Sequence, residues 1–424
     1  MKSQQPQFPG QDGPALATFL NPGHPLYRLS GVIDWAWFEE EFGPLYATGQ
    51  GRPALPTRLL VGLHYLKYLY NVSDEVVVAS WVENPYWQYL CGCEAFQHEL
   101  PCDPSSLVRW RRRVGAEGIE QLLKESLAVA RRTGILKARE LKRVIVDTTV
   151  QEKAIAFPTD ARLYHKARRA LVRLARQVGC PLRQSYVRLS KRALARQGRY
   201  AAAQQFKRAK RETRKLRRYL GCVLRNLERY AGPWRASQRR LLHLARRIFE
   251  QQRSDTGKVY SVHAPEVACI AKGKAQRRYE FGCKVQVVTT VHQPWIVGID
   301  AVAGNPYDGT TLKPALAQVQ TLTQVAPEEV FVDRGFRGQA HHPPDVTVYI
   351  SGRRNLSQSL KKLLRRRAAI EPVIGHTKHD HGMARNHLLG TVGDRINAML
   401  SGCAWNLRKL WRYFLDHPLP LPTT

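Results

Sequence analysis

The sequence predicts an α/β protein in which a sheet with helices on its faces is preceded by helices and interrupted by a basic helical insertion. Two short β-branched runs, each closed by an acid, lie far apart in the chain, and a hairpin-like pair of strands lies between them. Apolar residues at helical spacing fill the region before the first run. After that run comes a long segment in which basic residues far outnumber acidic ones.

Length and composition divide the chain into several segments. With 424 residues, the chain exceeds the usual size of a single core, so we expect two or three domains. The expected segments are a mobile Pro- and Gly-rich leader at 1–25, a helical N-terminal domain at 26–138, a core formed by 139–160 and 256–414, a basic helical insertion at 161–255, and a tail at 415–424.

The chain is strongly basic, with 67 Lys and Arg against 34 Asp and Glu and a formal net charge of +33. This sign of charge points to a polyanionic partner, either nucleic acid or an anionic membrane. The sequence has no run of 18 apolar residues, and its N-terminus lacks an apolar signal core. We therefore expect a soluble cytoplasmic protein that binds nucleic acid and no membrane.

Most of the excess charge lies in one segment, because Ala161 to Ser254 hold 28 Lys and Arg against three acids, a net charge of +25. Apolar residues at heptad spacing predict one long helix from Phe206 to Trp234, whose seam is either internal packing or a dimer contact. Like charges on one helix face repel each other, so we expect this face to lie against phosphate and not merely in solvent. The candidate DNA contacts on it are Arg214, Arg217 and Arg218.

Another candidate DNA contact lies in the N-terminal helices. Asp103 and Pro104 predict the start of a helix that runs through Arg113. Its polar start, apolar middle and basic end are typical of a recognition helix. The alternative is a helix whose basic last turn complements only its own dipole. The candidate contacts are Arg109, Arg111 and Arg112.

Two acids close apolar strands of the predicted core. The runs that end at Asp147 and Asp333 each predict a buried strand presenting a carboxylate. Such a carboxylate needs hydrogen bonds, a cation or a metal, although a lone acid is more often a helix cap or a loop residue. If the two strands are adjacent and parallel, their carboxylates converge, and converging carboxylates can hold Mg²⁺ against a phosphodiester.

A third acid would complete such a site, and the candidates are Glu371, Asp380 and Asp394. Glu371 is favoured because Arg367 and Lys378 would share its face of a regular helix; the alternative is a surface ion pair. Pro372 disfavours helical geometry at the preceding residue, so we expect a helix to begin with Pro372 and to leave Glu371 at the positive end of its dipole.

Eight cysteines are scattered along the chain. Cys91, Cys93 and Cys102, with His98 nearby, lack the second pair of ligands that a closed zinc site needs. We therefore expect reduced, packed thiols.

Several blocks stand in order between about His24 and Phe414, namely GRPALPTRLLVGLHYLKYLYNVSDE, CDPSSLVRWRRRVG, VIVDTTV, KGKAQRRYEFGCKV, VDRGFRG, IEPVIGHTKHDHGM and LLGTVGDRINAMLSGCAWNLRKL. Together they resemble bacterial insertion-sequence transposases with an Asp-Asp-Glu triad, most closely the insertion-sequence-five family. Arg367, Glu371 and Lys378 match the family pattern around its glutamate. Leu364 occupies the position of the family's tyrosine, so the aromatic contact of that pattern is missing.

The resemblance implies a ribonuclease-H-like mixed sheet with Asp147 on the first strand, Asp333 at the end of the fourth and Glu371 on the last helix. The basic insertion would lie between the first and second strands. The three acids would be catalytic and would hold two Mg²⁺ ions, for which Mn²⁺ could substitute. Arg367 and Lys378 would position phosphates near the cut.

The resulting prediction is a bacterial DNA transposase that binds the terminal inverted repeats of its element, cleaves to expose 3′-hydroxyl ends and joins them to target DNA. Its partners would be double-stranded DNA and other copies of the chain in a dimer or higher assembly, because two ends must be paired. The N-terminal domain would bind ends or mediate dimerisation, and the bound protein would be associated with the nucleoid. The alternatives are a metal-dependent nuclease without strand transfer and a non-catalytic DNA-binding protein.

Overall fold

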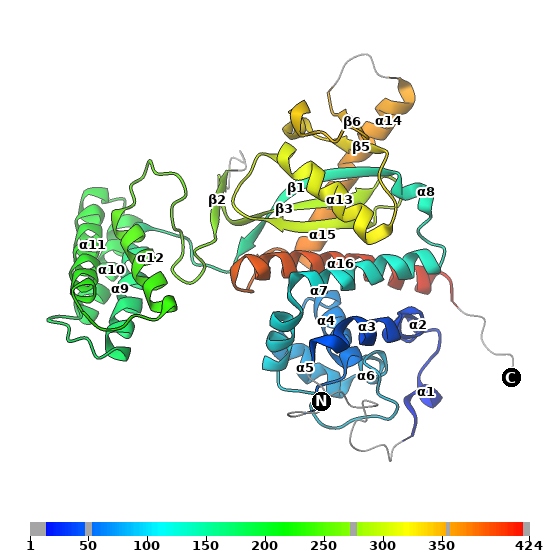
Figure 1. Ribbon diagram of the computed structural model, residues 1–424, viewed down its shortest axis with the longest axis horizontal. Coiled ribbons are helices and arrows are strands. Elements are labelled where there is room, and N and C mark those ends of the chain that lie inside the picture. Colours follow the sequence, from blue (N-terminus) through cyan, green and yellow to red (C-terminus); the bar gives the residue numbers. More distant parts are fainter. Residues whose placement is uncertain (1–13, 47–52, 272–277, 353–356, 419–424) are drawn as a thin grey trace. The chain divides into compact units, whose positions relative to one another are not determined.

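The computed structural model describes residues 14–46, 53–271, 278–352 and 357–418 (Figure 1). The chain divides into two compact units. The first comprises Met1–Glu152 and Lys284–Thr424, and the second comprises Lys153–Cys283. The second unit contains the predicted basic insertion together with the segments that flank it, and each unit has its own packed core.

The N-terminal helices pack in the same unit as most of the sheet. Their bounds are α1 Leu16–Phe19, α2 Pro25–Val32, α3 Trp35–Phe42, η1 Gly43–Leu45, α4 Thr57–Leu69, α5 Asp74–Glu83, α6 Pro85–Leu90, α7 Ser105–Arg132 and α8 Ala138–Leu141. Ser73 caps α5 as its sequence predicts, because its side chain accepts a hydrogen bond from the Val76 amide. Part of the expected mobile leader lies in residues 1–13, outside the described residues. Within the described part of the leader, Leu16 is fully buried and its amide donates to the Glu94 carbonyl, whereas most of its neighbours are exposed.

The helix predicted from Asp103 to Arg113 begins as expected but continues much further. Asp103 Oδ1 accepts a hydrogen bond from the Ser105 amide at 2.8 Å, where α7 starts. The helix runs to Arg132 with a kink at Gly115, whose φ of 67° lies in the left-handed region that favours glycine. The basic residues predicted at the end of a short helix therefore precede a kink within a long one.

The sheet is mixed, and it contains the predicted strands. Its strands are β1 Arg143–Lys153, β2 Ala268–Ala271, β3 Tyr279–Thr290, β4 Ile296–Val302, β5 Glu329–Val332, β6 Thr347–Ile350 and β7 Arg385–Asn386. The order is β2-β3-β1-β5-β6, with β4 paired to β3 and β7 to β1. β3 and β4 form the predicted antiparallel hairpin, and β5 is parallel to both β1 and β6.

One expectation about β1 is wrong. The sequence predicts a strand that ends at Asp147, but β1 continues through Lys153. Gln151 in this extension is buried, and it accepts a hydrogen bond from Asn397 and donates one to the Asp394 carbonyl. Asp147 therefore lies in the middle of a long strand, at the level where the neighbouring strand β5 stops.

Helices cover both faces of the sheet. Neighbouring residues of a strand point to opposite faces. On β4, Gly298 faces Val319 of α13 (Leu312–Thr323), and Ile299 faces Gly402 of α16 (Gly390–Asp416). The remaining helical segments are η2 Asp308–Thr311, η3 Arg334–Phe336, η4 Gln339–His341, α14 Gln358–Arg366, η5 Arg367–Ala369 and α15 Ile370–Asp380.

Helix α16 joins the sheet to the N-terminal helices, and α7 runs beside it (Figure 1). Asn406 on α16 is fully buried, and its amide pairs with the backbone of Ile296, donating to its carbonyl and accepting from its N–H. The same Asn406 amide nitrogen donates to Ser126 of α7. The Asn406 side chain thus satisfies the backbone N–H and C=O of Ile296 and links β4 to both α16 and α7.

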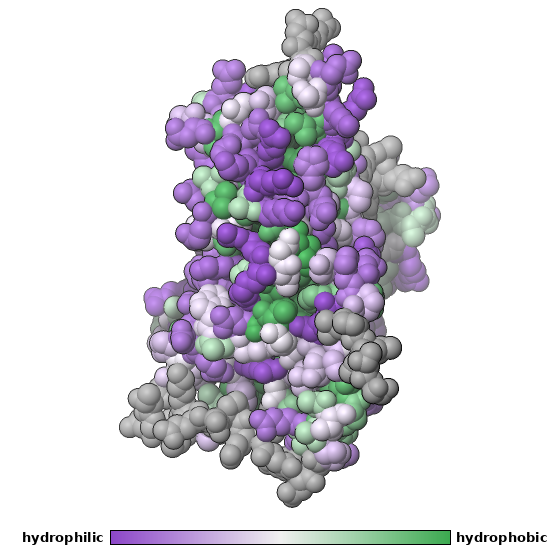
Figure 2. All heavy atoms as spheres, turned by 90° about the vertical axis from the view of Figure 1, so that its right-hand side faces the viewer, coloured by the Kyte–Doolittle hydropathy of each residue, from purple (hydrophilic) through white to green (hydrophobic). Residues whose placement is uncertain are grey.

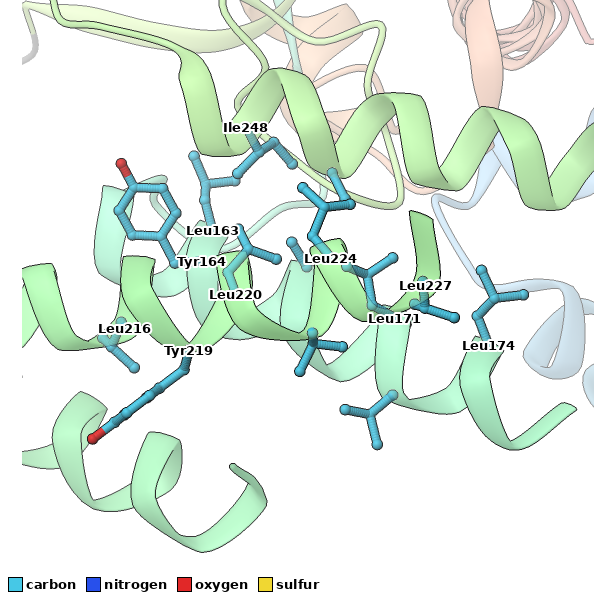
Figure 3. Close-up of a cluster of buried hydrophobic side chains, with 14 of the residues drawn as sticks. Leu163, Tyr164, Leu171, Leu174, Leu216, Tyr219, Leu220, Leu224, Leu227 and Ile248 are labelled. Atoms are coloured by element: carbon cyan, nitrogen blue, oxygen red, sulfur yellow. The ribbon is translucent and has the colours of Figure 1, made fainter. Parts of the chain in front are cut away.

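In the second unit, four helices surround one apolar cluster: α9 Asp160–Gln177, α10 Val187–Ala202, α11 Phe206–Glu228 and α12 Ala236–Glu250. Figure 3 shows side chains of α9, α11 and α12 meeting, among them Leu171, Leu220, Leu224 and Ile248. The predicted seam on α11 is therefore internal packing along most of its length. The helix is shorter than predicted, because it ends at Glu228 and leaves Trp234 beyond it.

Hydrophilic side chains make up most of the face drawn in Figure 2. No helix among the described residues is long and apolar enough to span a membrane. All eight cysteines are free, and burial raises the pKa of Cys91 to about 12, which keeps its thiol protonated at neutral pH.

The close approach of α16 and β4 predicts that Gly402→Ala destabilises the protein. A Cβ on Gly402 would lie 2.6 Å from Ile299 Cγ2, so overpacking should lower the free energy of unfolding by about 1–3 kcal/mol, measured by urea denaturation. Gly31→Ala on α2 is the control, because a Cβ there meets nothing within 4 Å and helix propensity favours alanine. Equal stabilities of the two variants would contradict the prediction.

Candidate active site

Asp147 and Asp333 lie at the same level of neighbouring parallel strands. In the register of β1 and β5, Val144 pairs with Val330 and Ile145 with Phe331. Two residues further on, the same register sets Asp147 beside Asp333, and partners in a parallel pair point to the same face. The structure thus confirms that the two acid-bearing strands are adjacent and parallel.

Local backbone contacts orient both carboxylates. Asp147 Oδ1 accepts a hydrogen bond from the Thr148 amide at 2.7 Å. Asp333 caps the short helix η3, and its Oδ1 accepts from the Gly335 amide at 2.7 Å. Each carboxylate accepts a hydrogen bond from an N–H within two residues of it, so the local backbone helps to fix its direction.

Glu371 lies in the first turn of α15, but the helix begins earlier than the sequence predicts. It starts at Ile370, so Pro372 is the third helical residue and not the first. Proline is tolerated there, because the amides of the first turn have no intrahelical acceptor. The helical segments α14 and η5 run directly into α15, so Glu371 does not lie at a free helix N-terminus as expected.

Arg367 connects this helical segment with the sheet. It lies in η5, one turn before Glu371, and its Nη1 is 3.5 Å from Asp147 Oδ2. Both side chains are largely buried. A residue predicted to bind phosphate is therefore paired with the first predicted acid.

The three predicted acids do not form a closed ligand set. Among the described residues, no three acidic, histidine or cysteine side chains are placed to hold a metal ion together. Asp147 and Asp333 share one level of the sheet, whereas Glu371 is exposed on α15, one turn after Arg367.

The structure brings a further acid, Asp308, to these residues. Asp308 begins η2, and its Oδ1 accepts hydrogen bonds from Thr148 Oγ1 at 2.9 Å and from Lys284 Nζ at 2.8 Å. Lys284 on β3 is itself buried. In the sequence, Asp308 lies in a Gly- and Pro-containing segment that gives no sign of a site residue. Its partners Thr148 and Lys284 lie far away along the chain.

Gly335 provides the space in which two of these carboxylates meet. A Cβ on this glycine would lie 2.8 Å from Asp308 Oδ2 and 2.9 Å from Asp333 Oδ1. The absence of a side chain at residue 335 therefore lets both carboxylates approach the same turn. Glycine is needed at residue 335 because a larger side chain would meet both carboxylates. Its backbone has no positive φ, so backbone conformation is not the reason for glycine at this position.

The predicted DNA contacts on α7 are not all exposed. Arg109 and Arg112 are exposed. Arg111 is buried, and its guanidinium forms two hydrogen bonds with Asp74, at 2.9 and 2.6 Å. Arg111 therefore stabilises the packing of α7 on α5, and in this structure it does not face solvent.

The three candidates on α11 also differ. Arg214 and Arg218 are exposed. Arg217 is half-buried, because its Nε donates to the Phe249 carbonyl at 3.0 Å and its guanidinium lies over the Phe249 ring. Arg217 links α11 to α12. Of the three candidates, Arg214 and Arg218 are therefore the two whose charged groups are exposed to solvent.

Two parts of the chain are similar to known transposase domains. Residues 14–113 match a family model described as a transposase domain, and residues 349–411 match one described as a transposase DDE domain. The chain is also 57% identical, over 191 residues, to a Rhizobium meliloti protein described as uncharacterized protein ORF8 in nfe locus. That match covers 45% of this chain and 92% of the relative. No solved structure matches.

The chain is thus a transposase of the kind that carries a DDE domain. It belongs to the insertion-sequence transposases of the DDE type. DNA is the partner of this family, and its DDE domains generally use divalent metal ions.

The carboxylate contacts at Gly335 predict that Gly335→Ala reduces transposition. The added methyl group must displace Asp308 or Asp333, and displacement of a catalytic group by about 1 Å can cost on the order of 10²-fold in rate. Transposition frequency in cells, with protein levels checked by immunoblot, measures the effect. Gly31→Ala should leave the frequency unchanged, and an equal frequency for Gly335→Ala would refute this role of the glycine.

Proposed function

We propose that this transposase binds the terminal inverted repeats of an insertion sequence, cleaves to expose 3′-hydroxyl ends and joins those ends to target DNA. The observation that carries the proposal is the alignment of Asp147 with Asp333 on parallel strands, together with the ion pair between Asp147 and Arg367. That ion pair brings the helical segment with Glu371 to the same end of the sheet. Asp147, Asp333 and Glu371 are the proposed catalytic residues.

The proposed core is ribonuclease-H-like. The order β4-β3-β1-β5-β6 contains an antiparallel hairpin on one side of β1 and two parallel strands on the other. Counting these strands along the chain, Asp147 lies on the first, Asp333 follows the fourth, and the second compact unit separates the first from the second. This agrees with what the resemblance of the sequence implies.

The donor chemistry fits Mg²⁺, which prefers hard oxygen ligands and keeps several waters. Asp147 and Asp333 present carboxylates at one level of the sheet, and Glu371 would complete the set by a shift of its helix. Two such ions would activate the attacking oxygen and stabilise the leaving oxygen of the phosphodiester. Mn²⁺ prefers the same oxygen ligands and would substitute.

The other side chains of the site have positioning roles in this proposal. Lys284 neutralises Asp308, and Asp308 fixes Thr148 next to the first catalytic acid. Arg367 neutralises Asp147 in the absence of DNA and stands where a phosphate would approach. Lys378, near the end of the same helix as Glu371, would hold a second phosphate.

The basic second unit would bind the duplex backbone through its exposed arginines. Phosphate contacts release counterions and supply affinity without reading sequence. Pairing of two element ends requires a complex of at least two chains, which is an inference from the reaction.

Asp147→Asn tests the chemistry. The variant should still bind end DNA but lose divalent-metal-dependent cleavage by roughly 10³-fold, because several kcal/mol of transition-state stabilisation depend on the carboxylate. Cleavage of labelled end DNA is the measurement, Glu371→Gln should behave likewise, and exposed Asp345→Asn is the control. Unchanged cleavage by Asp147→Asn would remove this triad from the mechanism.

An assay with pre-nicked ends and a supercoiled target distinguishes a transposase from a nuclease. The wild-type protein should yield joined products that carry the end DNA covalently linked to the target. Cleavage without any joined product would favour the nuclease alternative.

Arg214→Glu combined with Arg218→Glu tests the basic unit. The pair should weaken duplex binding about tenfold, and the slope of log affinity against log salt should fall by about 0.9 for each lost phosphate contact. Arg217 stays unchanged because it holds α12. The matched control is Arg139→Glu with Arg412→Glu, two exposed arginines of the other unit. An unchanged salt slope would mean that this face does not touch phosphate.

A further inference from the structure

A cavity of about 880 Å³ lies within the first compact unit, between α4, α5 and the start of α7 on one side and α15, β7 and the start of α16 on the other. Arg112 and Lys378 both line it. These two predicted DNA contacts are distant in the sequence, and the fold brings them to the walls of one cavity.

The charges that line the cavity favour an anion. Lys67, Arg111 and Asp74 line one wall of the cavity. Lys67 Nζ lies 2.7 Å from Asp74 Oδ1, and Arg111 Nη2 lies 2.6 Å from Asp74 Oδ2. Burial acts to raise the pKa of Asp74, but the hydrogen bonds and charges of Arg111 and Lys67 outweigh it and hold that pKa well below its ordinary value. This group of three charges carries one net positive charge.

The remaining charged lining adds to this excess. Arg112, Lys378 and Arg385 also line the cavity, against Glu75 as the other acid. Arg112 and Arg385 are exposed. The cavity as a whole is therefore positive, and its exposed cations can reach a ligand that enters from solvent.

The lining also has an apolar part, which includes exposed side chains. Val72, Val108, Leu388 and Ile396 contribute to the walls. Leu389 and Val392 also line the cavity, although 63% and 51% of their surfaces are exposed. Large apolar side chains left accessible inside a hollow are typical of a ligand site, whereas a phosphate backbone alone needs no apolar wall.

The cavity lies close to the proposed site of cleavage. Lys378 is seven residues after Glu371 on α15, and a helix rises 1.5 Å per residue, so about 10 Å of helix separate the two residues. This is about the length of three base pairs of duplex DNA. A strand bound beside Glu371 would therefore have a nucleotide within reach of Lys378 at the cavity wall.

We propose that this cavity takes one unpaired nucleotide of the DNA substrate, with its base against the apolar walls and its flanking phosphates on Arg112, Lys378 and Arg385. A hollow of this size admits a single base but not a duplex, and a base buries its apolar face while its phosphates remain outside. The inference rests on the proposed function, because it assumes that DNA is bound at the triad.

Binding of two DNA probes tests the proposal. One probe is a blunt duplex, and the other is the same duplex with a short single-stranded tail of thymidines; fluorescence anisotropy gives both affinities. The wild-type protein should bind the tailed probe about tenfold more tightly, because a base in the tail fills the cavity without first being unpaired.

Leu389→Trp and Val392→Trp should each fill the cavity and remove the preference for the tail. Thr391→Trp is the matched control, because Thr391 is exposed on the same helix and does not line the cavity, and it should keep the preference. Leu389 is mostly exposed at the mouth, so its replacement is compatible with folding, which thermal unfolding verifies.

The outcomes separate this inference from the proposed function. Duplex binding with no preference for the tail, or a preference that survives both cavity-filling variants, overturns the inference and leaves the function standing. Failure of the wild-type protein to bind either probe overturns both. A preference present in the wild-type protein and in Thr391→Trp but absent from the two filled variants supports the cavity as the nucleotide site.

Discussion

The burial of helix α16 is the constraint on which the first unit depends. Most of its residues from Gly393 to Leu410 are buried, because the helix lies between the sheet and the N-terminal helices and has apolar neighbours on nearly every side. Such a helix cannot be stable alone, since its surface would be almost entirely apolar. Asn406 adds polar specificity to this packing by bonding the backbone of β4 and the side chain of Ser126. The N-terminal helices and the sheet are therefore one folding unit, and the predicted site is supported by both.

Electrostatic balance shapes the candidate site. Several acids gather at one end of the sheet, and two of them are paired with cations of the chain: Arg367 faces Asp147, and Lys284 faces Asp308. Uncompensated carboxylates at the edge of a core would cost free energy through desolvation and mutual repulsion. The protein can therefore keep its acids together before DNA or a metal ion arrives.

The sequence predicted the features that depend on local patterns. Periodicity located most helices, and continuous apolar runs closed by an acid indicated which strands carry Asp147 and Asp333. Features set by distant partners were not predictable. β1 continues past Asp147 because Gln151 is held by α16. Arg111 is buried because Asp74 on another helix neutralises it. Asp308 is held at the site by hydrogen bonds from Thr148 and Lys284. Both partners are far from Asp308 in the sequence, so the local sequence around Asp308 does not indicate them.

The position of the basic unit within the chain has a consequence for folding. The chain leaves the first unit at the end of β1 and returns on β3, and these two strands pair in the sheet. Pairing them across a long unfolded segment would carry the entropy cost of closing a large loop. The second unit has its own apolar core. If it folds first and its two ends lie close together, the loop that must close before β1 and β3 pair is much shorter. Early folding of the basic helices would accelerate assembly of the sheet that carries the proposed catalytic acids.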